Sequence, residues 1–266
     1  MPLVTFASPK GGVGKTTLAA NIADRLAHLG WRVVVVDFDL QNLLRLHFAI
    51  PLSHTDGLAT PVLRNRSWPE ICRLTPSGIA ILPFGTITNN DNLRFQAFLR
   101  ETPTWLPERL ESLMRDPELL VIADTPPGPS PYLTEIEPLA AVKIAVLLSD
   151  AASIAQLPKI QAGQFYTDIG RPGAVPISYI INQVDLRRRL NRGVQDILKT
   201  KIGDEMLGTV HQDEAVAEAI ACQQLVAEFA PGSGATEDYT VIAKRVDALL
   251  KMRQQARPHY FEMRGS

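Results

Sequence analysis

The sequence predicts an α/β protein with a mostly parallel β-sheet and helices on both faces. Three observations support this class. The apolar runs at residues 31–36, 142–148 and 177–182 lack polar alternation, as expected of strands that are covered on both sides. Segments with helical character separate these runs along the chain. Finally, 45% of the 266 residues are apolar, which is enough for a large core.

The composition limits the possible functions. A formal net charge of −1 argues against a uniformly basic nucleic-acid binder, although not against a local basic patch. No apolar run approaches the roughly 20 residues that span a bilayer, and the N-terminus does not have the pattern of a signal peptide. We therefore expect a cytoplasmic protein. Cys72 and Cys222 are far apart and outside any Cys-x-x-Cys pattern, so we expect them to be thiols rather than metal ligands.

A glycine-rich loop at residues 8–17 follows the apolar run 3–7 and precedes a helical run that ends at Gly30. Glycines allow the backbone to turn its N–H groups toward a polyphosphate, and the first amides of the helix add to that positive field. Lys15 suits the β- and γ-phosphates, and the Thr16 hydroxyl suits Mg²⁺. A plain turn with a solvated lysine is disfavoured, because strand, loop spacing and helix all match a phosphate site. The predicted nucleotide contacts are Lys10, Gly11, Gly12, Val13, Gly14, Lys15, Thr16 and Thr17.

Lys10 stands before the paired glycines, and Pro9 occupies the position where the strict Walker pattern has glycine. The segment KGGVGKTT resembles the deviant Walker A ATPases of the MinD/ParA group, within the P-loop NTPase superfamily. This resemblance implies the SIMIBI/MinD-like fold, ATP and Mg²⁺ as ligands, and a homodimer that forms with nucleotide. It also implies that Lys10 reaches across the dimer to the partner's nucleotide, and that ATP hydrolysis is slow without a stimulating partner.

The strand at 31–36 delivers Asp37 and Asp39 to the carboxyl edge of the sheet, where open α/β sheets bind ligands. In the MinD/ParA group a D-x-D segment at this place is switch I. The resemblance implies that Asp39 orients the attacking water and helps to hold Mg²⁺, and that Asp37 supports it from the strand end. The alternative is a pair of solvated acids that close a strand.

Residues 118–124 form an apolar run that ends in Asp124, the Walker B pattern, which presents a carboxylate to the Mg²⁺ held by Thr16. Prolines then restrict the next loop to few conformations. The resemblance makes this D-T-P-P-G segment switch II, which senses the γ-phosphate and contacts the other subunit; the alternative is a stiff surface turn. The residues assigned to it are Asp124, Pro126, Pro127 and Gly128.

Between these motifs the sequence is less informative. We expect a helix at 42–48, a short helix at 57–63, a strand at 78–83 and a polar surface loop at 86–92. Residues 104–114 are amphipathic, and we assign that stripe to core packing without chemistry.

The second half continues with a helix at 152–169 and a strand that ends at Asn182. In the family an asparagine here bonds the adenine edge, although asparagine also ends strands for conformational reasons. Residues 206–213 resemble the last strand and the turn over the base, so His211 and Asp213 are assigned to nucleotide binding; relatives commonly have proline at position 211. Helices are expected at 214–222 and 237–252.

Arg187, Arg188, Arg189 and Arg192 form a basic cluster that suits DNA, a protein contact or a solvated face. One ATPase domain is expected over 1–255, with a tail at 256–266. Residues 254–261 include Pro258 and are too short and broken for a membrane-targeting helix. Arg264-Gly265-Ser266 is typical of residues that an expression tag leaves.

Four blocks outside the ATP motifs resemble the BcsQ family of bacterial cellulose-secretion operons: residues 42–48, His54-x-x-Gly57-x-Ala59, residues 82–85 and residues 211–218. The resemblance implies a cytoplasmic accessory of the membrane-bound cellulose synthase, which binds other cytoplasmic secretion subunits and positions the synthase from the inner membrane face. No segment resembles a glycosyltransferase. The alternatives are a ParA-type DNA partition ATPase, a MinD-like positioning ATPase and a scaffold that binds nucleotide without turnover.

Overall fold

Eight strands join into one sheet in the computed structural model, which describes residues 2–64, 66–114, 116, 118–171 and 173–256. Their order is β3-β4-β2-β5-β1-β6-β7-β8, and every neighbouring pair is parallel except β3 and β4. The predicted α/β class is therefore confirmed. The strands are β1 (Leu3–Ala7), β2 (Arg32–Asp37), β3 (Arg73–Leu74), β4 (Ala80–Leu82), β5 (Leu119–Asp124), β6 (Ala140–Leu148), β7 (Ile177–Val184) and β8 (Met206–His211).

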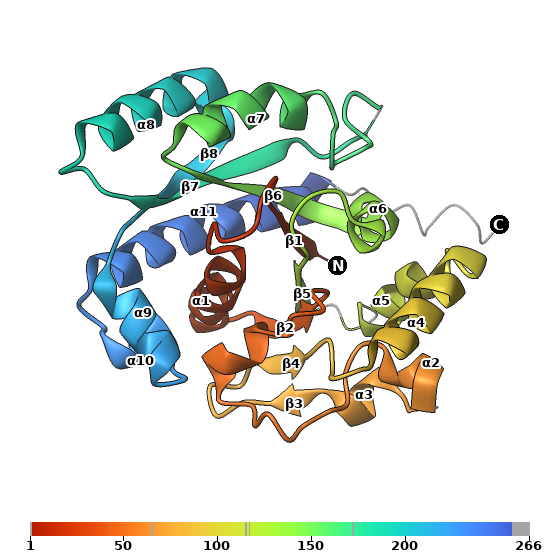
Figure 1. The fold of residues 1–266 in the computed structure, drawn as a ribbon. Coiled ribbons are helices and arrows are strands. Elements are labelled where there is room, and N and C mark those ends of the chain that lie inside the picture. The colour runs from red at the N-terminus through yellow and green to blue at the C-terminus, as the bar shows by residue number, and fades with distance from the viewer. Residues whose placement is uncertain (1, 65, 115, 117, 172, 257–266) are drawn as a thin grey trace.

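Helices cover both faces of this sheet (Figure 1). The α-helices of the described residues are α1 (Lys15–His28), α2 (Thr60–Arg64), α3 (Trp68–Ile71), α4 (Asn89–Glu101), α5 (Trp105–Leu113), α6 (Pro131–Ile136), α7 (Ala151–Gln161), α8 (Arg189–Ile202), α9 (Glu214–Ala221), α10 (Val226–Phe229) and α11 (Gly234–Ala256). The 3-10 helices are η1 (Leu44–Phe48), η2 (Glu137–Leu139) and η3 (Gly203–Glu205).

Each central strand contributes to two cores, because successive side chains point to opposite faces. In β2, Val33 and Val35 join the core under α1 and α11, whereas Val34 and Val36 join the core under α4, α5 and α6. A third core lies under α7 and α8, against β6 and β7. Burial on both faces explains why these strands read as unbroken apolar runs.

Some predicted elements were wrong in extent. The polar run 86–92 is not a loop throughout, because α4 begins at Asn89, where the Thr88 side chain accepts a hydrogen bond from the Asp91 amide. The first turn of α4 is polar, and its buried residues, Phe95 and Leu99, come later. Helix α7 ends at Gln161, well before residue 169, and the segment 42–48 is helical only from Leu44, as a 3-10 turn.

The amphipathic segment 104–114 is α5, whose Leu106 and Leu110 are buried, as its assignment to core packing predicted. Tail residues 257–266, with Pro258 and Arg264-Gly265-Ser266, lie outside the described residues. Among the helices that are described, none has the length and apolar character needed to cross a bilayer.

Two segments next to β4 meet backbone to backbone. Leu58 N donates to Pro83 O at 2.8 Å, and Thr86 N donates to Thr55 O at 2.9 Å. A Cβ atom on Gly57 would lie 2.2 Å from Gly85 N and 2.4 Å from Pro83 O. Only glycine allows this approach, because the opposing atoms are main chain and cannot rotate away.

We predict that Gly57→Ala lowers the free energy of unfolding by about 3 kcal/mol, because the new methyl group forces the two backbones apart. Gly193→Ala is the matched control: Gly193 lies inside α8, and its added Cβ would meet no atom within 4 Å. That change should leave stability equal or raise it by up to about 1 kcal/mol. Urea unfolding of both variants measures the difference, and equal stability would contradict the predicted clash.

Candidate nucleotide-binding site

The glycine-rich loop connects β1 to α1 and encloses a cavity of about 350 Å³. Gly12 and Gly14 have φ values of 75° and 80°, which is the left-handed conformation that glycine adopts without strain. Of the predicted residues, the cavity brings together Lys10, Gly11, Gly12, Val13, Gly14, Lys15, Thr16, Thr17, Asp39 and Pro127. Ser8, Gln41, Leu43 and Gln183 also line it, although they were not among the residues assigned to the site.

Beneath the loop lies a buried charge pair. Lys15 Nζ donates to Asp124 Oδ1 at 2.6 Å, and both side chains are almost fully buried. Asp37 stands directly beside Asp124 in the register of β2 and β5. Burial, and then the charge of Asp124, raise the pKa of Asp37 well above its usual value. The site therefore disfavours a second charged carboxylate at Asp37, beside the Lys15–Asp124 pair.

The residues present fit a magnesium ion bound with phosphate. Asp124 Oδ2 is buried and has no hydrogen-bond partner, so one oxygen is available beneath the loop. Within the described residues, no group of three or more His, Cys, Asp or Glu side chains could hold a metal by itself. A hydroxyl, carboxylates and phosphate oxygens form the all-oxygen donor set that Mg²⁺ prefers.

The segment after β2 turns around Asp37. Asp37 Oδ1 accepts from Asp39 N at 2.9 Å, and Oδ2 accepts from Leu44 N at 3.2 Å. Asn42 N donates to Asp39 O at 2.8 Å, and Asn42 has a φ of 53°. The half-buried Asp39 carboxylate accepts from Gln41 N and reaches the loop cavity.

The D-T-P-P-G segment is attached to the glycine-rich loop. Thr125 Oγ1 donates to Phe6 O at 2.7 Å, and Gly128 N donates to Ser8 O at 2.8 Å. Pro127 lines the cavity, close to Gly11. A movement at Ser8 or Gly11 therefore reaches this segment directly.

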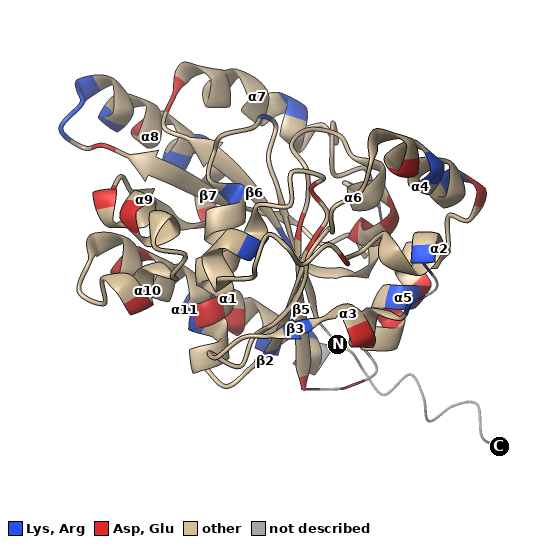
Figure 2. Cartoon of the chain, turned by 60° about the horizontal axis from the view of Figure 1, so that its bottom comes forward, with Lys and Arg blue, Asp and Glu red and all other residues tan. Residues whose placement is uncertain are grey.

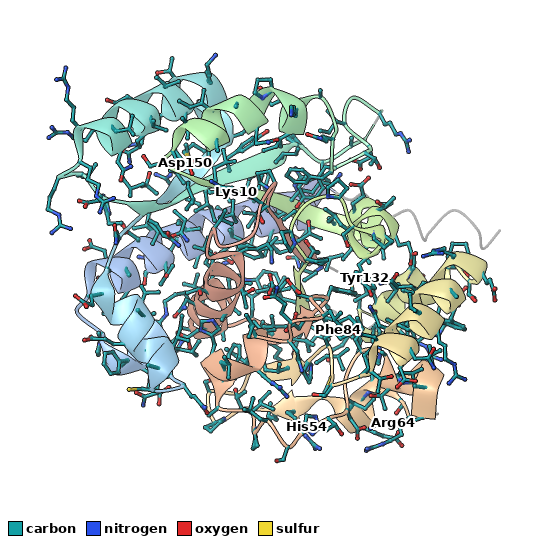
Figure 3. All side chains as sticks on the ribbon, in the orientation of Figure 1. Lys10, His54, Arg64, Phe84, Tyr132 and Asp150 are labelled. Carbon is teal, nitrogen blue, oxygen red and sulfur yellow. The ribbon has the colours of Figure 1, made fainter. Side chains whose placement is uncertain are left out.

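Lys10 forms an ion pair with Asp150, which follows β6 and caps the N-terminus of α7 (Figure 3). Burial alone would raise the pKa of Asp150, but hydrogen bonds from Lys10 and Ser153 lower it below its usual value. The sequence analysis missed Asp150. The available signal was an acid close to the carboxyl end of a buried parallel strand, as at Asp37 and Asp124.

A second cavity of about 280 Å³ adjoins the loop and includes Gly14, Thr17 and the predicted base-site residues Asn182, His211 and Asp213. Asn182 Nδ2 donates to Val13 O at 2.8 Å, and a Cβ on Gly14 would meet the same nitrogen. His211 Nδ1 lies 2.9 Å from an Asp238 carboxylate oxygen. Asp213 caps α9 by accepting from Ala215 N.

The basic cluster lies at the start of α8, where Figure 2 shows it at one end of the molecule. Arg187 Nε donates to Asp185 Oδ1 at 2.9 Å, and Arg188 Nε lies 3.3 Å from Asp185 Oδ2. Asp185 therefore compensates part of the positive charge of this cluster.

The fold and this site together define a P-loop NTPase of the MinD/ParA type. The septum site-determining protein MinD complexed with Mg-ADP from Pyrococcus horikoshii matches 95% of this chain and 98% of its own, with a TM-score of 0.76 and 21% identity. A putative plasmid partition protein from Borrelia burgdorferi, bound to AMPPNP, matches 94% of this chain and 99% of its own, with a TM-score of 0.72 and 20% identity.

Sequence comparison identifies the family. The family model described as cellulose biosynthesis protein BcsQ matches residues 1–246, and the chain belongs to this family. The cellulose biosynthesis protein BcsQ of Salmonella typhi is 27% identical over 244 residues, which cover 91% of this chain and 93% of that protein. The chromosome-partitioning ATPase Soj of Thermus thermophilus is 29% identical over 259 residues, covering 92% of this chain and 95% of that protein. Both resemblances found in the sequence are thus confirmed.

His47 connects η1 to the first turn of α1. Its Nε2 lies 3.5 Å from Thr17 Oγ1, and its buried Nδ1 has no partner. Burial lowers the pKa of His47 to about 4, so the ring is neutral at neutral pH. Neither its burial nor its neighbour could be read from the sequence.

We predict that His47 makes the protein sensitive to acid. As the pH falls from 6.5 toward 4, the unfolded chain binds a proton at this residue and the folded chain does not. The free energy of unfolding should therefore fall by up to about 3 kcal/mol over this range. Urea unfolding at several pH values should show a shallower dependence in His47→Gln and an unchanged one in the exposed control His28→Gln. An unchanged slope in His47→Gln would contradict the assignment.

Proposed function

We propose that this protein is an ATPase switch that forms a dimer over two Mg·ATP and serves cellulose synthesis and secretion. Its BcsQ family membership and its similarity to a protein named as a partitioning ATPase support this function. The observation that carries the proposal is the Lys15–Asp124 pair beneath the glycine loop, with Asp124 Oδ2 unpaired and Asp39 at the same cavity.

In the proposed complex the loop amides of residues 11–17 surround the phosphates, and Lys15 moves from Asp124 to the β- and γ-phosphate oxygens. Thr16, Asp39 and Asp124 would hold Mg²⁺, directly or through water. When bound, the ion would supply positive charge that offsets the negative charge of the phosphate groups during transfer. Asn182, His211 and Asp213 would surround the base and ribose.

For hydrolysis, Asp39 accepts a hydrogen bond from the attacking water and aims its oxygen at the γ-phosphorus. The new P–O bond forms as the bond to the β–γ bridging oxygen breaks, which yields ADP and inorganic phosphate. Loss of the γ-phosphate then releases residues 37–42 and 124–131, the proposed switch segments, and the dimer opens. We expect slow turnover in the absence of a partner.

The dimer would need Lys10 to leave Asp150 and approach the partner's nucleotide. The Lys10 and Asp150 side chains are 33% and 37% exposed. An ion pair with this exposure contributes about 1 kcal/mol or less to stability, so breaking the Lys10–Asp150 pair requires little free energy. Two triphosphates at close range repel each other strongly, and a lysine from each side would offset that repulsion.

The cellular role would be that of an accessory. The protein would bind cytoplasmic subunits of the cellulose-secretion machinery in its ATP-bound state and meet the membrane-bound synthase at the inner face of the membrane. Recovery of those subunits from a native extract with protein locked in the ATP state, and not with the ADP state, tests this role against DNA binding.

We predict that Asp39→Ala lowers phosphate release by about 100-fold, because the attacking water is no longer oriented. ATP binding should persist, and the ATP-bound dimer should accumulate. The control Asp204→Ala changes an exposed acid on η3 and should behave as the wild type. Phosphate release at the wild-type rate in Asp39→Ala would mean that another residue orients the attacking water.

For Lys10→Ala we expect ATP to bind with little change and the dimer to be lost, because the lysine acts on the other subunit. Sedimentation with AMPPNP and Mg²⁺ measures the dimer, and calorimetry measures nucleotide binding. Lys159→Ala, an exposed lysine on α7, is the control. A full dimer in Lys10→Ala would refute the cross-subunit role.

A further inference from the structure

Three of the four BcsQ-like blocks converge on one place in the fold. Phe84 N donates to Asn42 Oδ1 at 3.1 Å, which joins the block 82–85 to the block 42–48. Arg45 Nη1 donates to His54 O at 3.2 Å, and Leu58 N donates to Pro83 O. Segments that are separate in sequence therefore form one unit at the β4 side of the sheet.

The outer side of this unit carries a cluster of arginines. Arg73 Nη2 lies 3.3 Å from His54 Nδ1, and Arg64 Nη1 donates to Asp56 Oδ1 at 2.9 Å. Arg66 forms an ion pair with the other Asp56 oxygen. Arg64 and Arg66 therefore pair with Asp56, whereas Arg45 and Arg73 contact His54. Glu70, on α3, is a second acid near Arg66. In Figure 3, His54 and Arg64 lie on the same edge of the molecule, away from Lys10 and Asp150.

The pKa of His54 reflects the charges of the groups around it. Partial burial, and then the charge of Arg73, lower its pKa, and Arg45 and Arg66 act in the same direction. Its Nε2 is buried without a partner. Asp56 acts on His54 in the opposite direction. The four arginines outnumber the two neighbouring acids, Asp56 and Glu70, which leaves a formal excess of positive charge.

Two large apolar side chains flank the arginines. Leu52 is 64% exposed and Leu74 is 76% exposed. Leu74 belongs to β3, which is the edge strand of the sheet, and it follows Arg73 directly. Arg73 and Leu74 point to opposite faces of β3, so Leu74 borders the arginines across the edge of the sheet. Exposed leucines at the margin of an arginine cluster, next to a strand edge, suit a protein segment with both acidic and apolar side chains.

We propose that this arginine surface (Arg45, Arg64, Arg66 and Arg73, with Leu52 and Leu74) docks an acidic segment of a partner protein. Charge complementarity selects the sign of the partner. A protein segment fits better than nucleic acid, because Asp56 and Glu70 interrupt the positive charge that closely spaced phosphates need and the leucines offer them nothing.

The surface is linked to the nucleotide site through Asn42. Its side chain accepts from Phe84 N, while its own amide donates to Asp39 O. A change in residues 37–42 with the state of the γ-phosphate therefore displaces the block 82–85 and, through Pro83 and Leu58, the block 54–59. This nucleotide dependence rests on the proposed function, whereas the docking surface itself does not.

The test uses the full-length protein and a fluorescein-labelled peptide of twelve alternating Glu and Leu residues, with a Lys/Leu peptide as its control. We expect anisotropy to show acidic-peptide binding that added salt weakens, and that is lowered about tenfold or more by R64E/R66E. R188E/R192E makes the same charge change at the N-terminal end of α8 and should leave peptide binding unchanged. R64Q/R66Q removes the two charges without reversing them, and it serves as the second variant if R64E/R66E disturbs folding. Thermal unfolding checks that it is folded, and its loss of peptide binding should be smaller than that of R64E/R66E.

Three results would overturn the proposal. These are equal binding of the two peptides, an equal loss of acidic-peptide binding in R188E/R192E, and an affinity for duplex DNA that depends on Arg64 and is as high as that for the acidic peptide. Peptide affinity should also differ between AMPPNP and ADP, and equal affinities would refute the link through Asn42. Calorimetry of ATP on the same samples separates the outcomes: absent ATP binding contradicts the proposed function and leaves the docking surface intact.

Discussion

The buried contact between Lys15 and Asp124 is the interaction on which the rest of the site depends. It connects the first turn of α1 to the end of β5, two elements that are 109 residues apart in sequence. Breaking such a pair by removing one partner leaves an uncompensated buried charge and is strongly destabilising. Asp37 lies beside this pair, and its burial and the charge of Asp124 raise its pKa, which disfavours a second negative charge there.

Much of this arrangement could be predicted, because its determinants are local. A glycine-rich loop between strand and helix, and buried runs that end in Asp37 and Asp124, fix the motifs within short stretches. Parallel pairing then brings the strand ends to one edge. The contact of Lys10 with Asp150 spans 140 residues, and although Asp150 follows a buried strand, nothing near either residue indicates that they pair. The start of α4 was interpreted as loop because its first turn is polar.

The structure separates a general part from a particular part. The central strands β5, β1 and β6 carry the glycine-rich loop, Asp124 and Asp150, and so position the candidate nucleotide site and the Lys10 contact. Three of the blocks that resemble the BcsQ family outside the ATP motifs meet at the β4 side, where Gly57 and Gly85 allow two backbones to touch. The side chains on that unit, rather than those of the central sheet, therefore form the surface that is particular to this chain.

Asn42 belongs to both parts, and this has an evolutionary consequence. Its backbone N–H donates to Asp39 O, and its side-chain oxygen accepts a hydrogen bond from Phe84 N. A substitution selected for a new binding partner at the β4 side would also retune how long each nucleotide state lasts. Lineages that exchange partners should therefore carry compensating changes on both sides of Asn42, so that partner specificity and the lifetime of each nucleotide state change together.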